Sequence, residues 1–540
     1  MHVDEAVQAY KFGELYEHHE YRYDPKEYHG PTLNYATLPS AWMSGAKTYA
    51  DTDEFTYRIV PVVFGVATIL LLFLIVDGLG WAAVILAGVL TAISPALVFY
   101  NRYYIHESLL VCFTFGCIAA CWRYAQTRKT GWALLAGAFL GLMHATKETF
   151  VLSCAAAAVA VVCTIAWNRI RPTTRETRVV PPLRDDVKAW LPTPRALAAG
   201  VIVAVIVSAV LFSSFFTNAG GPLDSIRTYV ANMRRAAGQG IHDHPWHFYL
   251  NLLVYFKEAG GPVWTEGLIV LLALVGCVLA LWGRGFASPI VPSRTGSQQQ
   301  TEAARGTPDL ALARFVAFYT VVLTAIYAAI PYKTPWCMLT FLHGMILMAA
   351  IGAVAVVRLL PHTALKMVAG ALLLVGMAHL GWEASRASFL KRYYADWHNP
   401  YVYAHTTNDV VNFEKRMDDL AQVHPQGYGM LVKVIAKDYW PAPWYVRRFK
   451  NVGYWNSIPE DPDAPVVITS SQPETDETNG VTGAAPDDID AALSQALHGK
   501  YRKEFFGSRP GVFLIVYVNQ DLWNEFVRRR TAAPPPDTRR

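Results

Sequence analysis

The sequence IVPVVFGVATILLLFLIV, residues 59–76, carries no charged side chain and is long enough to cross the roughly 30 Å hydrocarbon layer of a membrane as a helix. Its length and composition predict a transmembrane span. Comparable apolar runs recur through the first two thirds of the chain, so we expect about ten spans. They are Ile59–Val76, Trp81–Tyr100, Leu109–Tyr124, Trp132–Ala145, Phe150–Trp167, Ala196–Phe216, Gly267–Trp282, Phe315–Pro331, Cys337–Val357 and Met367–Trp382, of which the third and fourth are short.

The composition of the whole chain agrees with this prediction. Of 540 residues, 53% are hydrophobic and only 16% are charged, which is typical of a multi-spanning membrane protein. The formal net charge of +5 is spread over a large chain and does not indicate a nucleic-acid partner. All 7 cysteines lie in or beside apolar runs, so we predict neither a disulfide framework nor a zinc site.

The basic residues of the loops set the orientation, because short cytoplasmic loops are enriched in Lys and Arg. Alternating the spans places four basic loops on one face, which we predict to be cytoplasmic, although the longer opposite loop 217–266 also carries Arg227, Arg234, Arg235 and Lys257. The four basic loops are Arg123–Lys129, Arg169–Arg195, Arg284–Arg305 and Arg358–Lys366. The opposite, extracytoplasmic face then receives residues 1–57, 101–107, 144–148, 217–266 and 332–336, and everything after Trp382. We therefore expect a multi-pass protein of the cell membrane with an extracytoplasmic active site.

This topology raises a question about the start of the chain. Residues 1–57 are polar and fall on the outer face, yet no apolar run precedes Asp4. Either the span at 59–76 draws this segment across, or a first transmembrane helix is missing and Met1 is not the true start. We expect the missing helix.

The sequence divides into four predicted parts. Residues 1–57 form a first outer loop, 58–382 a transmembrane bundle, 383–530 an outer α/β domain and 531–540 a disordered tail. The α/β prediction rests on strand-like runs that alternate with a helical stretch, which favours a partly parallel sheet. The runs are GMLVKVIA (429–436), PVVIT (465–469) and GVFLIVYV (511–518), with a helix at 487–497 and a loop at 470–486.

Ionisable residues gather at the helix ends of the predicted outer face. A charge at the membrane boundary costs several kcal/mol unless it is hydrated or paired, so such residues are candidates for function. Snorkelling and anchoring at the interface explain any one of them about equally well. The candidates are Asp4, Glu5, His29, Arg58, Arg102, Glu107, Lys147 and Lys333.

These residue types have a common chemical logic. Carboxylates such as Asp4, Glu5 and Glu107 can deprotonate a hydroxyl or hold a metal ion or a sugar hydroxyl. Cations can bind a phosphate and stabilise it as it leaves. The cationic candidates are Lys147, Lys333, Arg58 and Arg102. A base and phosphate-binding cations on one face of a membrane protein are typical of transfer from a lipid-phosphate donor.

Several motifs carry a family resemblance that spans most of the chain. They are HVDEAVQAYKFGELYE, YRYDPKEYHGPTLNYATLP, NRYYIHES, ATKETF, HDHPWHFYL, YKTPW and DYWPAPWYVRRFKNVGYW. In content and order the chain resembles the GT-C membrane glycosyltransferases, which include protein O-mannosyltransferases and lipid A aminoarabinose transferases. Within this group it is most similar to a prokaryotic subgroup, the flippase-activity-associated membrane proteins.

The resemblance implies roles for individual residues. The catalytic acidic residue of the first outer loop corresponds to Asp4, with Glu5 beside it, and the acidic residue of the next outer turn corresponds to Glu107. Lys147 and Lys333 correspond to donor-phosphate contacts. The chain departs from the family pattern in lacking its first transmembrane helix.

A second correspondence concerns the substrate loop, whose candidates are Tyr28, His29 and Pro31. His29, Gly30 and Pro31 correspond to the family's His-Pro-Pro element, with Gly30 in place of a Pro.

The expected activity is transfer of a sugar from a polyprenyl-phosphate donor to a glycan, lipid or protein hydroxyl, with inversion at the anomeric carbon. A flippase, or a flippase accessory without transferase activity, is the first alternative. It is disfavoured because transporters place charged or broken helices at the midplane, whereas these helix interiors are nearly free of charge. A non-catalytic scaffold that binds an envelope partner is the second alternative.

Two further groups of residues have open interpretations. His242, His244 and Asp4 are weak candidates for a divalent metal, although the two histidines suit packing in an aromatic loop better. No cofactor is predicted with certainty. An aromatic group could stack on sugar rings or, slightly better, dock the outer domain on the membrane. It consists of Tyr439, Trp440, Trp444, Tyr445 and Tyr454.

Overall fold

The computed structural model describes residues 1–26, 29–171, 191–236, 242–286, 309–476, 480–485 and 488–532. The chain forms two compact units. The membrane unit consists of Glu20–Ser40 and Tyr57–Leu390, and the sheet unit consists of Met1–His19, Ala41–Thr56 and Lys391–Arg540. This division differs from the expected one, because the predicted outer loop 1–57 is shared between the two units.

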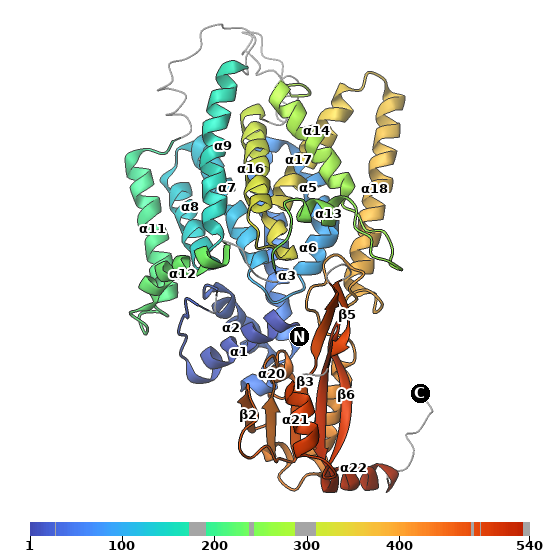
Figure 1. Ribbon diagram of the computed structural model, residues 1–540. Coiled ribbons are helices and arrows are strands. Elements are labelled where there is room, and N and C mark those ends of the chain that lie inside the picture. The colour runs from blue at the N-terminus through green and yellow to red at the C-terminus, as the bar shows by residue number, and fades with distance from the viewer. Residues whose placement is uncertain are drawn as a thin grey trace, which may run out of the picture. The chain divides into compact units, whose positions relative to one another are not determined.

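The membrane unit is built of helices (Figure 1). Within the described residues, seven helices are long and apolar enough to cross a membrane, and three apolar helices are shorter. Together they correspond to the predicted spans. The helices are α2 (Thr32–Ser44), α3 (Glu54–Leu71), α4 (Val76–Leu79), α5 (Trp81–Ile93), α6 (Pro95–Tyr100), α7 (Glu107–Thr127), α8 (Thr130–His144), α9 (Phe150–Ile170), α11 (Pro194–Phe212), α12 (Gly221–Ala236), α13 (Phe248–Val254), α14 (Gly267–Trp282), α16 (Leu310–Ala329), α17 (Leu339–Leu359) and α18 (Thr363–Phe389), with 3₁₀ turns η2 (Leu72–Ile75) and η3 (Pro335–Met338).

Some predicted spans have different bounds in the structure. The span at 109–124 is not short, because α7 is 21 residues long. The span at 367–382 extends through α18 to Phe389, so the outer domain begins later than the predicted residue 383. The predicted span Trp81–Tyr100 is broken into α5 and α6, since Pro95 lacks the amide hydrogen needed to continue α5.

The break between α5 and α6 is stabilised by a buried carboxylate. Glu266 is fully buried and accepts hydrogen bonds from the Ser94 hydroxyl (2.6 Å) and the Ala96 amide (2.8 Å). The Ser94 hydroxyl also lies at capping distance from the Leu97 amide. Amides at the start of a helix have no partner within the helix, so these side chains supply the missing acceptors.

Close packing in the membrane unit depends on small residues, as is common between membrane helices. Helix pairs in contact are α14 with α17, α8 with α11, α9 with α16, α7 with α8 and α6 with α18. At the α14–α17 crossing, a Cβ atom on Gly276 would lie 2.2 Å from the Met348 carbonyl oxygen, and one on Gly352 would lie 2.4 Å from that of Leu272. Only glycine fits at these two positions.

The sheet unit contains helices α1 (Val3–His18), α19 (Val410–Val423), α20 (Ala442–Tyr445), α21 (Asp488–Ala496) and α22 (Gln520–Ala532) and 3₁₀ turns η1 (Tyr49–Asp51) and η4 (Gly427–Gly429). Its strands are β1 (Leu431–Ile435), β2 (Asn451–Trp455), β3 (Val466–Ser470), β4 (Gln472–Asp476), β5 (Gly480–Ala485), β6 (Tyr501–Arg509) and β7 (Val512–Asn519). These bounds confirm the predicted C-terminal α/β domain and its three predicted strands.

The main sheet has five strands in the order β2-β1-β3-β7-β6 (Figure 1). β1 is parallel to β2 and β3, whereas β7 is antiparallel to β3 and β6, so the sheet is partly parallel as predicted. Helix α21 covers one face through Leu493, which packs with Val467, Ile515 and Tyr517. The core of this unit therefore lies between the β3–β7 pair and a helix that the sequence indicated.

Two other sequence predictions concern the end of the chain. The segment 470–486 is not a simple loop, because β4 and β5 pair as a small antiparallel ladder within it. Polar and glycine-rich composition hid this ladder from the sequence analysis. The predicted disordered tail begins inside α22, which ends at Ala532, and the rest of the tail lies outside the described residues.

The N-terminal helix α1 completes the sheet unit. It contacts α20, and its residues Ala6, Ala9 and Phe12 are fully buried. Thus residues from the two ends of the sequence share one core.

Candidate functional site

A buried ion pair joins two turns of the membrane unit. Lys147, in the turn between α8 and α9, donates a hydrogen bond from Nζ to Oε1 of Glu107, the first residue of α7. Each side chain is only 6% exposed. Burial lowers the pKa of Lys147, but the charges of Glu107, Cys337 and Glu148 and the hydrogen bond to Glu107 together raise it above its ordinary value. Lys147 is therefore a fixed cation at physiological pH, as an anion-binding role requires.

The neighbouring residue Glu148 forms a second ion pair. His29 Nδ1 lies 2.9 Å from Glu148 Oε2, and the two side chains are 34% and 13% exposed. Burial raises the pKa of Glu148, but the nearby His29 and Lys147 lower it by a larger amount, so that it falls to about 2. Because the ionised carboxylate only accepts hydrogen bonds, His29 carries a hydrogen on Nδ1.

His106 connects these pairs to the chain around Gly30. Its Nε2 donates to the Gly30 carbonyl oxygen at 3.0 Å, and its ring meets that of His29 edge-on at 5.2 Å. Burial, together with the nearby His29 and Lys147, holds the pKa of His106 well below its usual value. His106 is therefore a neutral side chain that positions the segment.

Gly30 is held against the Lys147 turn by backbone hydrogen bonds. Its amide donates to the Thr146 carbonyl at 3.0 Å, and the Thr32 amide donates to the Ala145 carbonyl at 3.1 Å. A Cβ atom on Gly30 would lie 2.1 Å from the Ala145 carbonyl oxygen. This close approach explains why a residue without a Cβ atom stands at position 30. Pro31 follows, and its carbonyl accepts the first hydrogen bond of α2.

Lys333 lies in the turn between α16 and η3 and is 1% exposed. Its Nζ donates to the carbonyl oxygens of His244, at 2.9 Å, and Ile330. Burial lowers its pKa, and Asp243 partly opposes this effect. An ammonium group has three hydrogens, and these contacts use two of them. These two carbonyl oxygens therefore fix the position of the Lys333 ammonium group.

Cys337 brings the two lysine turns into one cluster. Its Sγ is 3.2 Å from the hydroxyl of Thr334, the residue after Lys333. Cys337 also lies close enough to Lys147 and Glu107 to interact with their charges. Sequence analysis placed Cys337 in an apolar run and assigned no role to Glu148, His106 or Thr334. Their only sequence signal was adjacency to Glu107, Lys147 and Lys333.

The two arginine candidates contact different parts of the membrane unit. Arg102 donates to the Ser388 carbonyl and lies 4.4 Å from the ring centre of Phe389, so it contacts the end of α18. Arg58, on α3, lies 5.5 Å from the ring centre of Tyr103. Tyr28, the remaining substrate-loop candidate, lies outside the described residues.

The acidic pair Asp4 and Glu5 of α1 belongs to the sheet unit, and the two side chains differ in their exposure to solvent. The Asp4 side chain is 49% exposed, and its Oδ2 lies 3.7 Å from His2 Nδ1. Glu5 is fully buried and accepts from the His2 amide at 2.7 Å, forming a capping box at the helix start. Asp4 is therefore the carboxylate that a substrate can reach, and Glu5 stabilises the helix that carries it.

The histidine candidates for a metal serve as packing groups in the structure. The ring of His242 meets Tyr332 at 4.9 Å, and that of His244 stacks on Phe248 at 4.1 Å. Across the described ranges, no three His, Cys, Asp or Glu side chains converge as metal ligands would.

Comparison with solved structures identifies the fold. The crystal structure of ArnT from Cupriavidus metallidurans bound to undecaprenyl phosphate matches with a TM-score of 0.57 at 11% identity, covering 96% of this chain and 94% of that one. Its apo form gives 0.55 at 12% identity, with coverages of 96% and 94%. The apo oligosaccharyltransferase of Archaeoglobus fulgidus gives 0.50 at 12% identity, with coverages of 97% and 73%. The chain is thus a polytopic membrane protein with the GT-C glycosyltransferase fold.

Sequence comparison points to the same class of protein. Residues 39–176 match the family model of dolichyl-phosphate-mannose-protein mannosyltransferase. This stretch includes Glu107 and Lys147. No curated protein matches the chain. The solved structures show the GT-C fold that the sequence resemblance predicted, and the family model matches residues 39–176 only, while the narrower flippase-associated subgroup stays a prediction.

Proposed function

We propose that this protein transfers a sugar from a polyprenyl-phosphate donor to an acceptor hydroxyl at the extracytoplasmic face of the membrane. The observation that carries the proposal is the fixed, buried cation Lys147, paired with Glu107 at an outer helix end of a GT-C fold. Burying two charges costs desolvation free energy, so a buried ion pair indicates a role in function or specificity rather than in stability. Support also comes from ArnT, a protein of the same fold, which has been crystallised with undecaprenyl phosphate.

The proposed reaction assigns a step to each group. The acceptor oxygen forms a bond to the anomeric carbon while the bond from that carbon to the phosphate oxygen breaks. Asp4 takes the hydroxyl proton as general base. The bonding electrons leave with the polyprenyl phosphate, whose charge is stabilised by Lys147 and Lys333. Attack from the face opposite the leaving phosphate inverts the anomeric carbon.

The contacts rank the remaining candidates. His29 and Pro31 shape the segment that is hydrogen-bonded to the Lys147 turn. Arg102 already binds a backbone carbonyl and an aromatic ring, so we assign it a structural role at α18. Arg58 remains a candidate for the phosphate.

The test uses the full chain in lipid nanodiscs, a panel of radiolabelled polyprenyl-phosphate sugars and a membrane extract as acceptor. Label transfer by the unmodified protein that falls at least 100-fold in Asp4→Asn, roughly the least expected for loss of a general base, would support both the activity and the base. Glu20→Gln is the matched control, because Glu20 is 66% exposed and paired only loosely with Arg22.

Two outcomes would count against parts of the proposal. Transfer that survives in Asp4→Asn would retain the enzyme and remove Asp4 as its base. Absence of transfer from every donor, with folded protein, would favour a flippase accessory instead.

A further inference from the structure

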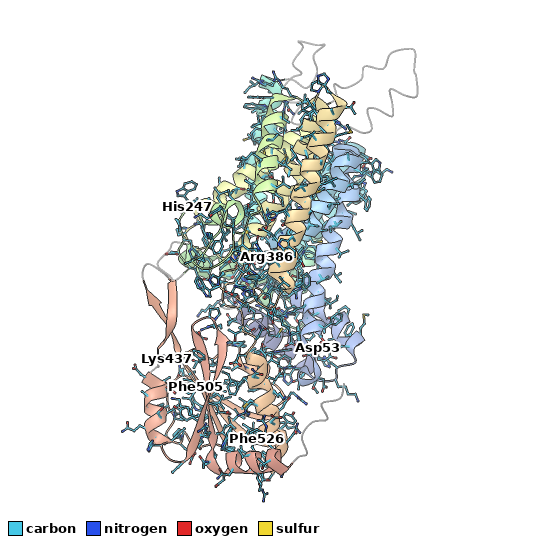
Figure 2. The ribbon with its side chains drawn as sticks, turned by 90° about the vertical axis from the view of Figure 1, so that its right-hand side faces the viewer. Asp53, His247, Arg386, Lys437, Phe505 and Phe526 are labelled. Atoms are coloured by element: carbon cyan, nitrogen blue, oxygen red, sulfur yellow. The ribbon has the colours of Figure 1, made fainter. Side chains whose placement is uncertain are left out.

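Four aromatic side chains of the sheet unit form a connected group, named here the aromatic cluster. They are Tyr10 on α1, Tyr439 and Trp440 after β1, and Tyr454 on β2. The Tyr10 and Trp440 rings meet edge-on at 6.2 Å, Tyr439 and Trp440 are 6.0 Å apart, and Tyr439 and Tyr454 are 5.1 Å apart. Three chain segments that are distant in sequence therefore present their rings together. Lys437, labelled in Figure 2, lies two residues after the end of β1 and two before Tyr439 in the chain.

Burial separates the aromatic cluster from its sequence neighbours. Trp444 is fully buried, donates to Glu54 Oε1 at 3.1 Å and lies under the Arg447 guanidinium at 3.8 Å. Tyr445 is also buried. By contrast, Tyr10 is 44% and Tyr454 38% exposed. Trp444 and Tyr445 thus hold the unit together, whereas Tyr10 and Tyr454 are exposed and Tyr439 and Trp440 are partly exposed, which leaves the aromatic cluster available to a ligand.

Polar groups accompany the exposed rings. Glu14 follows Tyr10 by one helical turn and pairs with Lys11 at 2.7 Å. Partial burial, with Glu14 nearby, raises the pKa of Tyr10, and burial raises that of Tyr454, so both phenols keep their hydrogens at neutral pH. Among the residues that the structure describes, the hydroxyls of Tyr10, Tyr439 and Tyr454 form no hydrogen bond with another protein group.

This combination matches the chemistry of a sugar ring. A pyranose or furanose presents a face of C–H groups, which packs on an aromatic ring, and a rim of hydroxyls, which needs donors and acceptors. We propose that the aromatic cluster is a saccharide-binding subsite and that the acceptor of this protein is therefore a glycan. That the bound glycan is the acceptor rests on the proposed function, whereas saccharide binding at the aromatic cluster does not.

The neighbouring charges argue against membrane docking as the role of the aromatic cluster. A surface that binds a bilayer combines exposed apolar groups with cations for the lipid headgroups. Here the carboxylate of Glu14 lies beside Tyr10, and Asp438 adjoins Tyr439 in the chain. Of the neighbouring cations, Lys11 pairs with Glu14 and Arg509 pairs with Asp438, while the exposed Lys437 adjoins Asp438 in the chain. A neutral, hydroxyl-rich ligand suits this surface better.

The test measures saccharide binding directly, without requiring transfer. The full chain in nanodiscs is titrated with tetrasaccharides of mannose, glucose and N-acetylglucosamine, and binding is followed by saturation-transfer NMR and calorimetry. We expect at least one tetrasaccharide to bind, and Tyr10→Ala and Trp440→Ala each to weaken its binding at least tenfold. Trp397→Ala is the matched control, because Trp397 is an exposed Trp (49%) of the same unit. Two variants are used in case Trp440→Ala does not fold.

The outcomes distinguish this subsite from the proposed function. No binding by the unmodified protein, or equal binding by folded variants, would overturn the subsite even if sugar transfer is observed. Loss of fluorescence quenching by lipids brominated in their acyl chains in Trp440→Ala but not in Trp397→Ala, with no tetrasaccharide effect, would replace it with membrane docking. Binding that is lost in the cluster variants would support the subsite even if no donor supports transfer.

Discussion

Glu107 and Lys147 lie 40 positions apart in the sequence and form an ion pair that water hardly reaches. The pair ties the start of α7 to the turn between α8 and α9, so one contact fixes both a carboxylate and a cation at the same helix ends. Their individual roles were predicted from sequence, whereas their pairing depends on the fold.

The pair should show strong energetic coupling. Removing one charge leaves the other buried and alone, so Glu107→Gln and Lys147→Met should each destabilise the protein by about 3–5 kcal/mol. The double variant should be much less destabilised than the sum of the two. Equilibrium unfolding in detergent of the four proteins gives the coupling energy. Additive effects of the single changes would contradict a buried pair.

Acid should weaken the contact between Glu148 and His29. The pKa of Glu148 is lowered in the folded protein to about 2 from an ordinary 4.5. Stability from this carboxylate is thus complete above pH 4.5 and is lost as pH falls toward 2. The difference of 4.5 − 2 = 2.5 units corresponds to roughly 3 kcal/mol.

The measurement compares thermal unfolding of the unmodified protein and Glu148→Gln between pH 7 and pH 3. The unmodified protein should be more stable at pH 7, and its advantage should shrink below pH 4.5. An advantage independent of pH would show that the carboxylate charge does not matter.

Gly30 should not tolerate a side chain. In Gly30→Ala the new Cβ would clash with the Ala145 carbonyl, which forces the backbone apart and should cost about 1–3 kcal/mol. The Lys147 turn should shift with it, so transfer activity should fall as well. Gly131→Ala, where a Cβ has open space, is the control and should keep both properties. Unfolding midpoints and transfer rates of the two variants provide the comparison.

Substitutions of Asp4 and Glu5 should have different effects, one on transfer activity and the other on the free energy of unfolding. Asp4→Asn changes an exposed carboxylate and should leave the unfolding free energy nearly unchanged while it abolishes transfer. Glu5→Gln weakens the buried capping box of α1 and should cost about 0.5–2 kcal/mol. If Glu5→Gln instead removes activity without loss of stability, Glu5 is the base.

Local patterns in the sequence predicted the fold well. Apolar runs gave the membrane helices, and β-branched runs gave β1, β3 and β7, because these signals depend on nearby residues. Pro95 carried a local signal for the α5–α6 break, but the length of the apolar run concealed it. β2 and β6 were missed because their composition is mixed and their pairing partners lie elsewhere in the chain.

Long-range contacts limited the prediction of the site. The sequence indicated Glu107, Lys147 and Lys333 from their place at helix ends, but it gave no sign that Cys337 lies beside Lys147. It also could not show that Glu5 is buried and Asp4 exposed, since burial in α1 depends on a partner helix near the other end of the chain.

The shared core of α1 and α20 has a consequence for the order of events during synthesis. Phe12 leaves the ribosome early, while Ala442 of its partner helix follows roughly 400 residues later. At about 5–20 residues per second, α1 waits on the order of 20–80 seconds before its apolar side can be covered. Throughout that time the segment must be protected by the membrane or a chaperone. The sheet unit can therefore complete its folding only after the last membrane helix has been made.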